Sequence, residues 1–301
     1  MHIRALIGSL LMIPALLLVA CGGAPAAQTP TTAPTAAQAP AAPPPAAQPT
    51  AAQAPAAPTA QPAAPAAQAA PVVVTGAGAT PDDIRAKVEE YRALLGAPDN
   101  GGTPGTQPSG HRSINWDGLT DEQSAPNLYE PNLFNDTKPP RARGAVLDTP
   151  GTGLMVSADG DNPSGASPRF GNIDDSYSNS FTTYSGERMF SPVGSNIADL
   201  TFFVPGTQTP AVVRGFGAVY ADVDSDHTAF EYFDINDRSL GAFATPISDN
   251  GLSFLGVAFA EPIVHRVRIT YGTAALGKPD GPGNDVAVMD DFIYGEPQAA
   301  P

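Results

Sequence analysis

The stretch IVHRVRITY, residues 263–271, indicates which kind of fold this chain adopts. Apolar or ring side chains recur at every second position, which are Ile263, His265, Val267, Ile269 and Tyr271. Polar side chains alternate with them at Arg266, Arg268 and Thr270. Successive side chains of a β-strand point to opposite faces, so this alternation predicts an antiparallel strand with one face buried and the other facing solvent.

Short runs of β-type residues, separated by turn residues, continue this character over residues 111–297. We predict strands over 113–116, 144–148, 154–158, 169–173, 180–184, 188–191, 197–204, 212–223, 229–234, 240–247, 252–259, 263–271 and 286–294. The run Val212–Val223 is apolar on both faces, so we expect it in the centre of a sheet. This spacing predicts an all-β fold, a two-sheet antiparallel β-sandwich that is jelly-roll-like.

One amphipathic helix is predicted before the sandwich, over residues 80–96. Thr80 is a favourable N-cap, and Pro81 suits the first helical position. Apolar side chains follow at helical spacing, namely Ile84, Val88, Tyr91 and Leu95. Residues 97–110 are rich in Gly and Pro and are predicted to be a linker. The helix either docks on the sandwich or forms a stalk.

The segment before the helix is predicted to be a disordered tether. Residues 22–71 consist almost entirely of Ala, Pro, Gln and Thr, with no charged side chains. Such a composition cannot bury enough apolar surface to fold, and its prolines oppose helix formation. We place the tether, with the cysteine that precedes it, over residues 21–79; O-glycosylation of its threonines is an alternative role.

The amino end has the three parts of a bacterial export signal over residues 1–20: a basic start at Arg4, an apolar stretch and a small residue before the cut. The sequence LVAC that ends at Cys21, the only cysteine, resembles the lipobox of bacterial lipoproteins. The resemblance implies cleavage before Cys21 and a lipid on its sulfur, which would anchor the exported chain to a membrane. Gly22 favours the outer membrane or cell surface. The alternative is an ordinary secretory signal.

Several phrases of the sandwich also resemble a family. They are INWDG (114–118), RFGNI (169–173), FFVPGT (202–207), RGFGAVYADVD (214–224), FLGVAF (254–259) and VMDDFIYGEP (288–297). In this order they are similar to an uncharacterised family of exported bacterial proteins, over about residues 90–298. That resemblance implies no activity. The last phrase is also similar to the final strand of jelly-roll carbohydrate-binding modules.

Charge and residue types exclude several functions. The net charge of −15 repels phosphate backbones, so we expect no nucleic-acid partner. The three histidines beyond the signal, His111, His227 and His265, do not have the spacing of metal ligands. No Gly-rich phosphate loop leads from a strand into a helix. We therefore predict a protein that is not an enzyme, although 30 acidic residues leave a carboxylate-dependent glycoside hydrolase as an alternative.

Acidic groups in the sandwich are candidates for a structural Ca²⁺, which prefers oxygen ligands. The candidates are Asp290 and Asp291 in the last strand, Asp222, Asp224 and Asp226 after the central strand, and Asp159, Asp161 and Asn162 in a loop. One of the neighbouring strand residues Asp290 and Asp291 must face inward, where a buried carboxylate has to be paired or bound to a metal. The alternative for each group is a solvated loop or pairing with Arg and backbone amides.

A ligand site is predicted around the only tryptophan, Trp116, with its neighbours Asn115 and Asp117. A core position is the alternative for Trp116. Further ring candidates are Tyr177, Tyr184, Tyr220 and Tyr232, and Arg214 and Arg266 are either ligand contacts or ion-pair partners. We predict a surface-tethered, non-catalytic lipoprotein that binds carbohydrate or another envelope ligand. The alternatives are a structural or adhesion protein and the hydrolase.

Overall fold

The computed structural model describes residues 69–301. The predicted signal peptide, Cys21 and the predicted tether as far as residue 68 lie outside the described residues. Among residues 69–301, no helix is both long and apolar enough to span a membrane.

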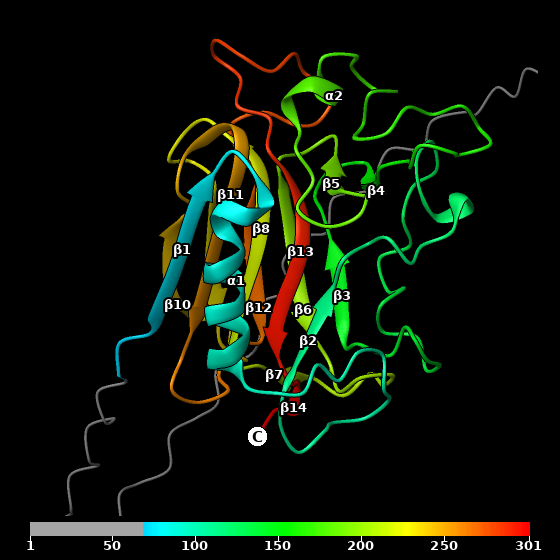
Figure 1. The fold of residues 1–301 in the computed structure, drawn as a ribbon. Helices are drawn as coiled ribbons and strands as arrows, with labels where there is room; N and C mark the ends of the chain where they lie inside the picture. Colours follow the sequence, from blue (N-terminus) through cyan, green and yellow to red (C-terminus); the bar gives the residue numbers. More distant parts are fainter. Residues whose placement is uncertain (1–68) are drawn as a thin grey trace, which may run out of the picture. The chain divides into compact units, whose positions relative to one another are not determined.

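Two antiparallel sheets form the domain (Figure 1). The first sheet contains β1 (Val72–Gly78), β2 (His111–Ile114), β4 (Gly153–Val156), β5 (Phe190–Val193), β8 (Gly215–Val223), β11 (Ser248–Ala258) and β13 (Val288–Gly295). The second contains β3 (Ala145–Asp148), β6 (Ile197–Phe202), β9 (Ala229–Phe233), β10 (Ser239–Ala244) and β12 (Arg266–Thr270). Two short strands, β7 (Ala211–Val212) and β14 (Gln298–Ala299), pair with each other.

The strand order confirms the predicted sandwich and its jelly-roll character. The first sheet runs β1-β11-β8-β13-β5-β4, with β2 also paired to β13, and the second runs β10-β9-β12-β6-β3. Within them, the neighbours β5-β13-β8-β11 face the neighbours β6-β12-β9-β10. This is the eight-strand arrangement of a jelly roll, in which the chain passes repeatedly between the two sheets.

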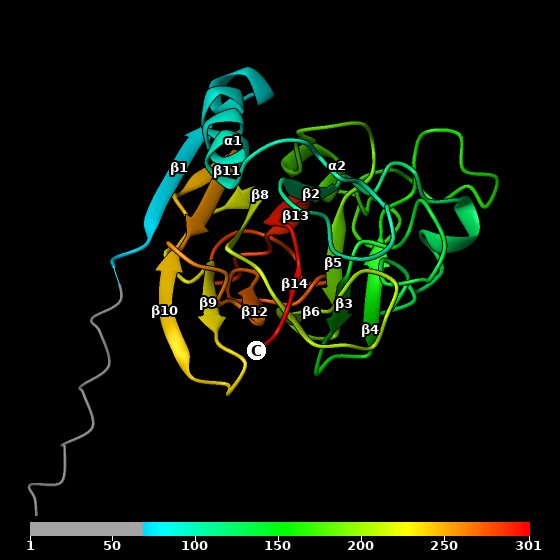
Figure 2. The ribbon, with the colours of Figure 1, turned by 90° about the horizontal axis from the view of Figure 1, so that it is seen from below.

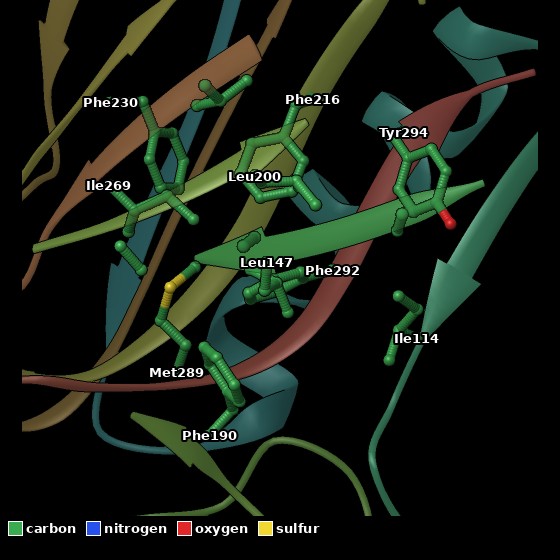
Figure 3. Packing of buried hydrophobic residues seen from close by; sticks show 14 of the residues in the cluster. Ile114, Leu147, Phe190, Leu200, Phe216, Phe230, Ile269, Met289, Phe292 and Tyr294 are labelled. Carbon is green, nitrogen blue, oxygen red and sulfur yellow. The ribbon is translucent and has the colours of Figure 1, made fainter. Parts of the chain in front are cut away.

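The space between the sheets holds the main core (Figure 3). Phe216, Phe292 and Leu200 meet there from three different strands. The alternation that predicts β12 is confirmed, because Val267 and Ile269 are buried whereas Arg268 is exposed. Every residue of β8 is buried, as expected for a central strand, since one face meets the other sheet and the outer face is also covered.

The helix α1 (Pro81–Leu95) docks on the outer face of the first sheet, so it is not a stalk (Figure 2). Its buried Tyr91 occupies a slot that glycines leave open. A Cβ on Gly256 would lie 2.6 Å from the ring, and one on Gly217 would lie 2.8 Å from it. The Tyr91 hydroxyl donates a hydrogen bond of 2.9 Å to the carbonyl of Val257. Glycine in these two strands therefore admits the anchoring ring of the helix.

The structure corrects the boundary of the predicted tether. Residues 72–78 form the edge strand β1, which pairs with β11 from Val72–Ala258 to Gly78–Leu252. The β-branched run Val72–Val74 supplies strand propensity, and Val74 is buried within the cluster that includes the helix. Sequence reasoning missed this short run because the Ala/Pro repeats before it dominate the composition of the segment.

The predicted linker 97–110 also belongs to the domain. Arg112 at the start of the sandwich is fully buried and donates hydrogen bonds to the carbonyls of Gly101, Thr103 and Gly105. It also forms a two-bond ion pair with Glu296, with distances of 2.8 and 2.7 Å. This arginine thus fastens the segment to the end of β13.

Two predicted strands are wrong. Residues 169–173 form turns, and the predicted strand over 180–184 begins with the last residue of the short helix α2 (Tyr177–Ser180) and continues without strand structure. Arg169 and Phe170 have φ values of 52° and 60°, in the left-handed region that a strand does not use. The apolar residues of this region are buried against the outer face of the first sheet, so they imitate a strand pattern without sheet pairing. A 3-10 turn, Asp121–Gln123, is a further element outside the prediction.

Candidate functional site

Trp116 lies in the core, which corrects the prediction that its ring meets a ligand. It is 1% exposed and stacks on Phe190 with 4.4 Å between ring centroids. Its indole nitrogen donates a 2.8 Å hydrogen bond to the carbonyl of Asp290. Asn115 is exposed, and Asp117 is half-buried. The core alternative for Trp116 is therefore the one that the structure has.

The other ring and arginine candidates are mostly structural. Tyr177, Tyr220 and Tyr232 are fully buried, whereas Tyr184 is only partly buried. Arg214 donates to the carbonyls of Phe259 and Leu94, and Arg266 pairs with Asp199 and Asp237. These two arginines thus hold the helix end and the second sheet, respectively.

Asp290 and Asp291 both reach the same serine, contrary to the expectation that one of the two faces inward. A bulge between Met289 and Phe292 places two residues opposite one of β8, which breaks the alternation of the strand. The Ser185 hydroxyl lies 3.1 Å from Asp290 Oδ1 and 2.6 Å from Asp291 Oδ1.

Protein donors surround this carboxylate pair. Asp290 Oδ2 accepts from the backbone amide of Tyr184 at 2.6 Å, and Asp291 Oδ2 accepts from Arg92 at 3.0 Å. Burial, and then the charge of Asp291, raises the pKa of Asp290 well above its ordinary value. Burial also raises the pKa of Asp291, with Ser185 and Arg92 opposing the rise. The two carboxylates are thus paired with an arginine and a backbone amide, which is the alternative to a metal site given in the sequence analysis.

A second acidic cluster forms where β8 ends. Asp222, Asp224 and Asp249 each bring one carboxylate oxygen within 4.8 Å of the others. The pairing of Val223 with Ser248 brings the two segments together. Asp226, which the sequence predicts as the third member, points away with a side chain 85% exposed, beside His227. The structure therefore keeps two of the three predicted residues and replaces Asp226 by Asp249.

Burial dominates the electrostatics of this cluster. Desolvation, with the nearby charges of Asp280, Asp224 and Asp249, raises the pKa of Asp222 to about 7. Desolvation and the same kind of neighbours raise the pKa of Asp224 to about 6. Asp285 also has a raised pKa because of burial, which a hydrogen bond from Ser225 partly offsets. The surroundings are thus unfavourable for additional negative charge and favourable for a cation.

The third predicted acidic group borders an open groove of about 510 Å³. Its lining consists of Asp117, Asp159, Gly160, Asp161, Gly186, Glu187 and Arg188. Asp117 Oδ1 accepts from the backbone amides of Glu187 and Arg188 at 3.0 and 3.1 Å. A smaller hollow of about 250 Å³, lined by Pro168, Arg169 and Thr183, shares Gly186 and Glu187 with the groove.

Arg188 is the fixed centre of this groove. Its side chain is 4% exposed and bonds to Asp121 at 2.9 Å and to Asp159 at 2.5 Å. The other oxygen of Asp159 is buried and has no hydrogen-bond partner among the described residues. Asn162 beside them bonds within its own turn, to the Ser164 hydroxyl at 2.6 Å. Asp161 is exposed at the rim.

Sequence reasoning missed Arg188, Glu187 and Asp249 as site residues. Arg188 and Glu187 meet Asp117 only through a contact about 70 positions apart along the chain. Asp249 lies at the start of β11, between two predicted strands, so its carboxylate was visible in the sequence but the residues that surround it in the fold were not. Knowledge of which turns share one end of the sandwich would be needed to find it.

A hollow of about 510 Å³ lies elsewhere, between the β9–β10 turn and the C-terminus. Its lining includes Ile235, Leu240 and Ile263, together with an ion pair between the exposed Arg238 and the buried Asp234. This surface is more apolar in its residues than the groove around Arg188.

Comparisons with known proteins add little. No protein-family model and no curated protein matches the chain. Among solved structures, the enzymatically active domain of tailspike protein 4 from bacteriophage CBA120 matches with 12% identity and a TM-score of 0.25. The match covers 59% of this chain and 21% of that chain, so the chain spans about a fifth of that structure. A likeness with this TM-score carries no argument about fold or function.

Proposed function

We propose that this chain is an exported, lipid-anchored binding module without catalytic activity, and that its ligand is a carbohydrate of the cell envelope. The anchoring rests on the export signal and on the lipobox that ends at Cys21. Two or three acyl chains on one cysteine suffice for stable membrane attachment.

The observation that carries the binding role is the polar groove around Arg188. Sugar hydroxyls are bound by several converging donors and acceptors, and carboxylates accept strong hydrogen bonds from them. The groove offers the carboxylates of Asp159, Asp161 and Glu187 together with its buried arginine. Asp161 and Glu187 are exposed, so their carboxylates are acceptors that a ligand hydroxyl can reach.

The groove is also rigid before any ligand arrives. Asp117 holds the backbone of residues 187 and 188, and Glu187 in turn accepts from the amide of Gly160 at 2.7 Å. These contacts join three loops that come from distant parts of the chain. Preorganised groups lose less conformational entropy on binding, which favours recognition of a weakly held ligand such as a sugar.

The proposal that the chain is not catalytic is supported by the contacts of its histidine and serine side chains. The rings of His111 and His265 bond to the main-chain carbonyls of Gly96 and Ala211. The Ser225 hydroxyl donates to Asp285, and the ring of His227 lies beside Asp226. Among residues 69–301, these contacts provide no hydroxyl that a histidine base activates.

A glycoside hydrolase is the second candidate, because the groove brings four carboxylates together. Glycosidases use two carboxyl groups on opposite sides of the scissile bond. Asp117 is occupied by backbone amides, which leaves Asp159, Asp161 and Glu187 for such roles.

A glycan array with the full chain tests the proposal. We expect a discrete set of bound glycans, with affinity lowered about tenfold or more in Asp161→Asn, since that is the loss of one charge-assisted hydrogen bond. The matched control is Asp148→Asn, an exposed acid on β3 that lies outside the groove. Binding that survives in Asp161→Asn at full strength refutes the groove as the site.

Two further outcomes separate the alternatives. A structural or adhesion protein would bind no glycan on the array. A hydrolase would release product from a bound glycan, and Glu187→Gln would abolish this release without changing the melting temperature. Either result overturns the non-catalytic binding module.

A further inference from the structure

The acidic cluster at the end of β8 combines three segments of the chain. Asp222 and Asp224 stand at and after the end of β8, Asp249 lies in the first residues of β11, and Asp285 precedes β13. Asp224 and Asp285 line one cavity of about 290 Å³, next to the trio of Asp222, Asp224 and Asp249. The cluster is independent of the groove around Arg188, so the inference drawn from it does not rest on the proposed function.

Unpartnered buried oxygens distinguish this cluster from an ordinary acidic surface. Asp222 is fully buried; its Oδ1 accepts from the amide of Asn250 at 2.7 Å, but its Oδ2 has no partner among the described residues. Asp224 Oδ1 and Asp285 Oδ1 are likewise buried without a donor. A buried carboxylate oxygen without a partner is costly, and three of them in one place call for a bound positive group.

The donor set selects the kind of cation. Every ligating atom in the trio is a carboxylate oxygen, which hard divalent cations prefer and soft metals do not. Ser225 and Asn284 line the adjoining cavity, and their side chains are further oxygen sources. Ca²⁺ takes six to eight oxygens in flexible geometry, so it tolerates such a mixed set better than Mg²⁺ does.

We infer that Asp222, Asp224 and Asp249 form a Ca²⁺ site that fastens the β8–β9 turn to the start of β11. Asp285 borders the site and contributes negative charge from the loop before β13. β1 begins at Val72, opposite Ala258, whereas the site adjoins Ser248 at the other end of β11 (Figure 1). The ion would therefore tighten the end of the sandwich opposite to the first residue of β1.

Calorimetric titration of CaCl₂ into the full chain, after removal of metal with a chelator, tests this inference. We expect saturable binding of one ion and a melting temperature raised by about 5–10 °C at a Ca²⁺ concentration near 100 times the dissociation constant. MgCl₂ should bind at least about tenfold more weakly.

Two aspartate variants, one within the site and one control outside it, test which residues bind the ion. Asp249→Asn changes an exposed member of the trio, so the variant should fold, and its Ca²⁺ affinity should fall about tenfold or more. Asp226→Asn changes an acid of the β8–β9 turn, which also carries Asp224, but its side chain is 85% exposed, so the Ca²⁺ affinity of this variant should equal that of the parent.

Specific results would overturn the inference. One is a full chain that shows neither binding heat nor a Ca²⁺-dependent melting temperature. Another is equal loss of affinity in Asp249→Asn and Asp226→Asn, which would reveal a diffuse charge effect. Failure of glycan binding would not affect this inference, because the glycan array tests the groove around Arg188 whereas the Ca²⁺ titration tests the cluster of Asp222, Asp224 and Asp249.

Discussion

Replacing Arg112 by Met should destabilise the domain more than any exposed ion pair does. Arg112 is fully buried, and its partner Glu296 has a side chain only 3% exposed. The substitution keeps the apolar volume but leaves the Glu296 carboxylate buried without its cation. Removing one partner of a buried pair costs about 3–5 kcal/mol. For a domain of this size, each kcal/mol lowers the melting temperature by about 2–4 °C, so we expect a decrease of about 6–20 °C.

Arg112 also donates hydrogen bonds to backbone carbonyls, and their loss favours the larger of the expected decreases in melting temperature. It donates to Gly101, Thr103 and Gly105 of the segment before β2 and to Ala142. The segment can turn its carbonyls toward water when the arginine is lost, at the expense of its packing. We therefore expect increased amide hydrogen exchange over residues 97–110 in Arg112→Met, in addition to the lower stability.

Thermal and urea denaturation of the full chain provide the measurement, with Lys87→Met as the control. Lys87 pairs with Glu90 on the helix, and the two side chains are 48% and 54% exposed, so the loss of this pair should cost less than about 1 kcal/mol. The double substitution of Arg112 and Glu296 by Met should be less destabilising than Arg112→Met alone, because it leaves no unpaired charge. If Arg112→Met unfolds within about 1 kcal/mol of the parent, the reasoning about the buried pair is refuted.

Two further predictions concern the helix and the carboxylate pair. Gly256→Ala should cost about 1–3 kcal/mol in thermal denaturation, since its Cβ would lie 2.6 Å from the Tyr91 ring; an equal cost in a Tyr91→Leu background would show that the ring is not the obstacle. For Asp290, the folded pKa lies above the unfolded value, so its stabilising contribution is complete below the unfolded pKa of about 3.8 and is lost as pH rises through the folded pKa. Asp290→Asn cannot ionise, so the stability of this variant should fall less than that of the parent as the pH rises above about 3.8, and an identical dependence of stability on pH in both proteins would contradict this.

Local patterns were sufficient for most of the sandwich. The alternation in β12 and the apolar run of β8 report directly which faces are buried, because each strand carries its own burial pattern. The helix is equally visible from its N-cap and spacing. In contrast, β1 follows fifty residues of Ala/Pro repeats, and its few apolar residues become meaningful only when the edge of β11 is known.

The sites depended on contacts between distant segments. Asp249 joins Asp222 because β11 pairs with β8, and Arg188 meets Asp121 because of the way that loops cover the first sheet. Trp116 shows the opposite difficulty, since polar neighbours in the sequence suggest a surface that the folded ring does not occupy. Residue type alone therefore indicated which acidic residues were candidates for a site, but not which residues they contact in the fold.

Tension on the amino-terminal side of the domain reaches it first through β1. The backbone bonds between β1 and β11 run perpendicular to the strands over seven paired positions. A pull along the strand axis loads these bonds together in shear, whereas a pull across the sheet opens them in succession from Val72, like a zip. The attachment should consequently withstand a drag that acts along β1 better than one that lifts the strand away, which gives the domain a mechanically preferred direction of loading.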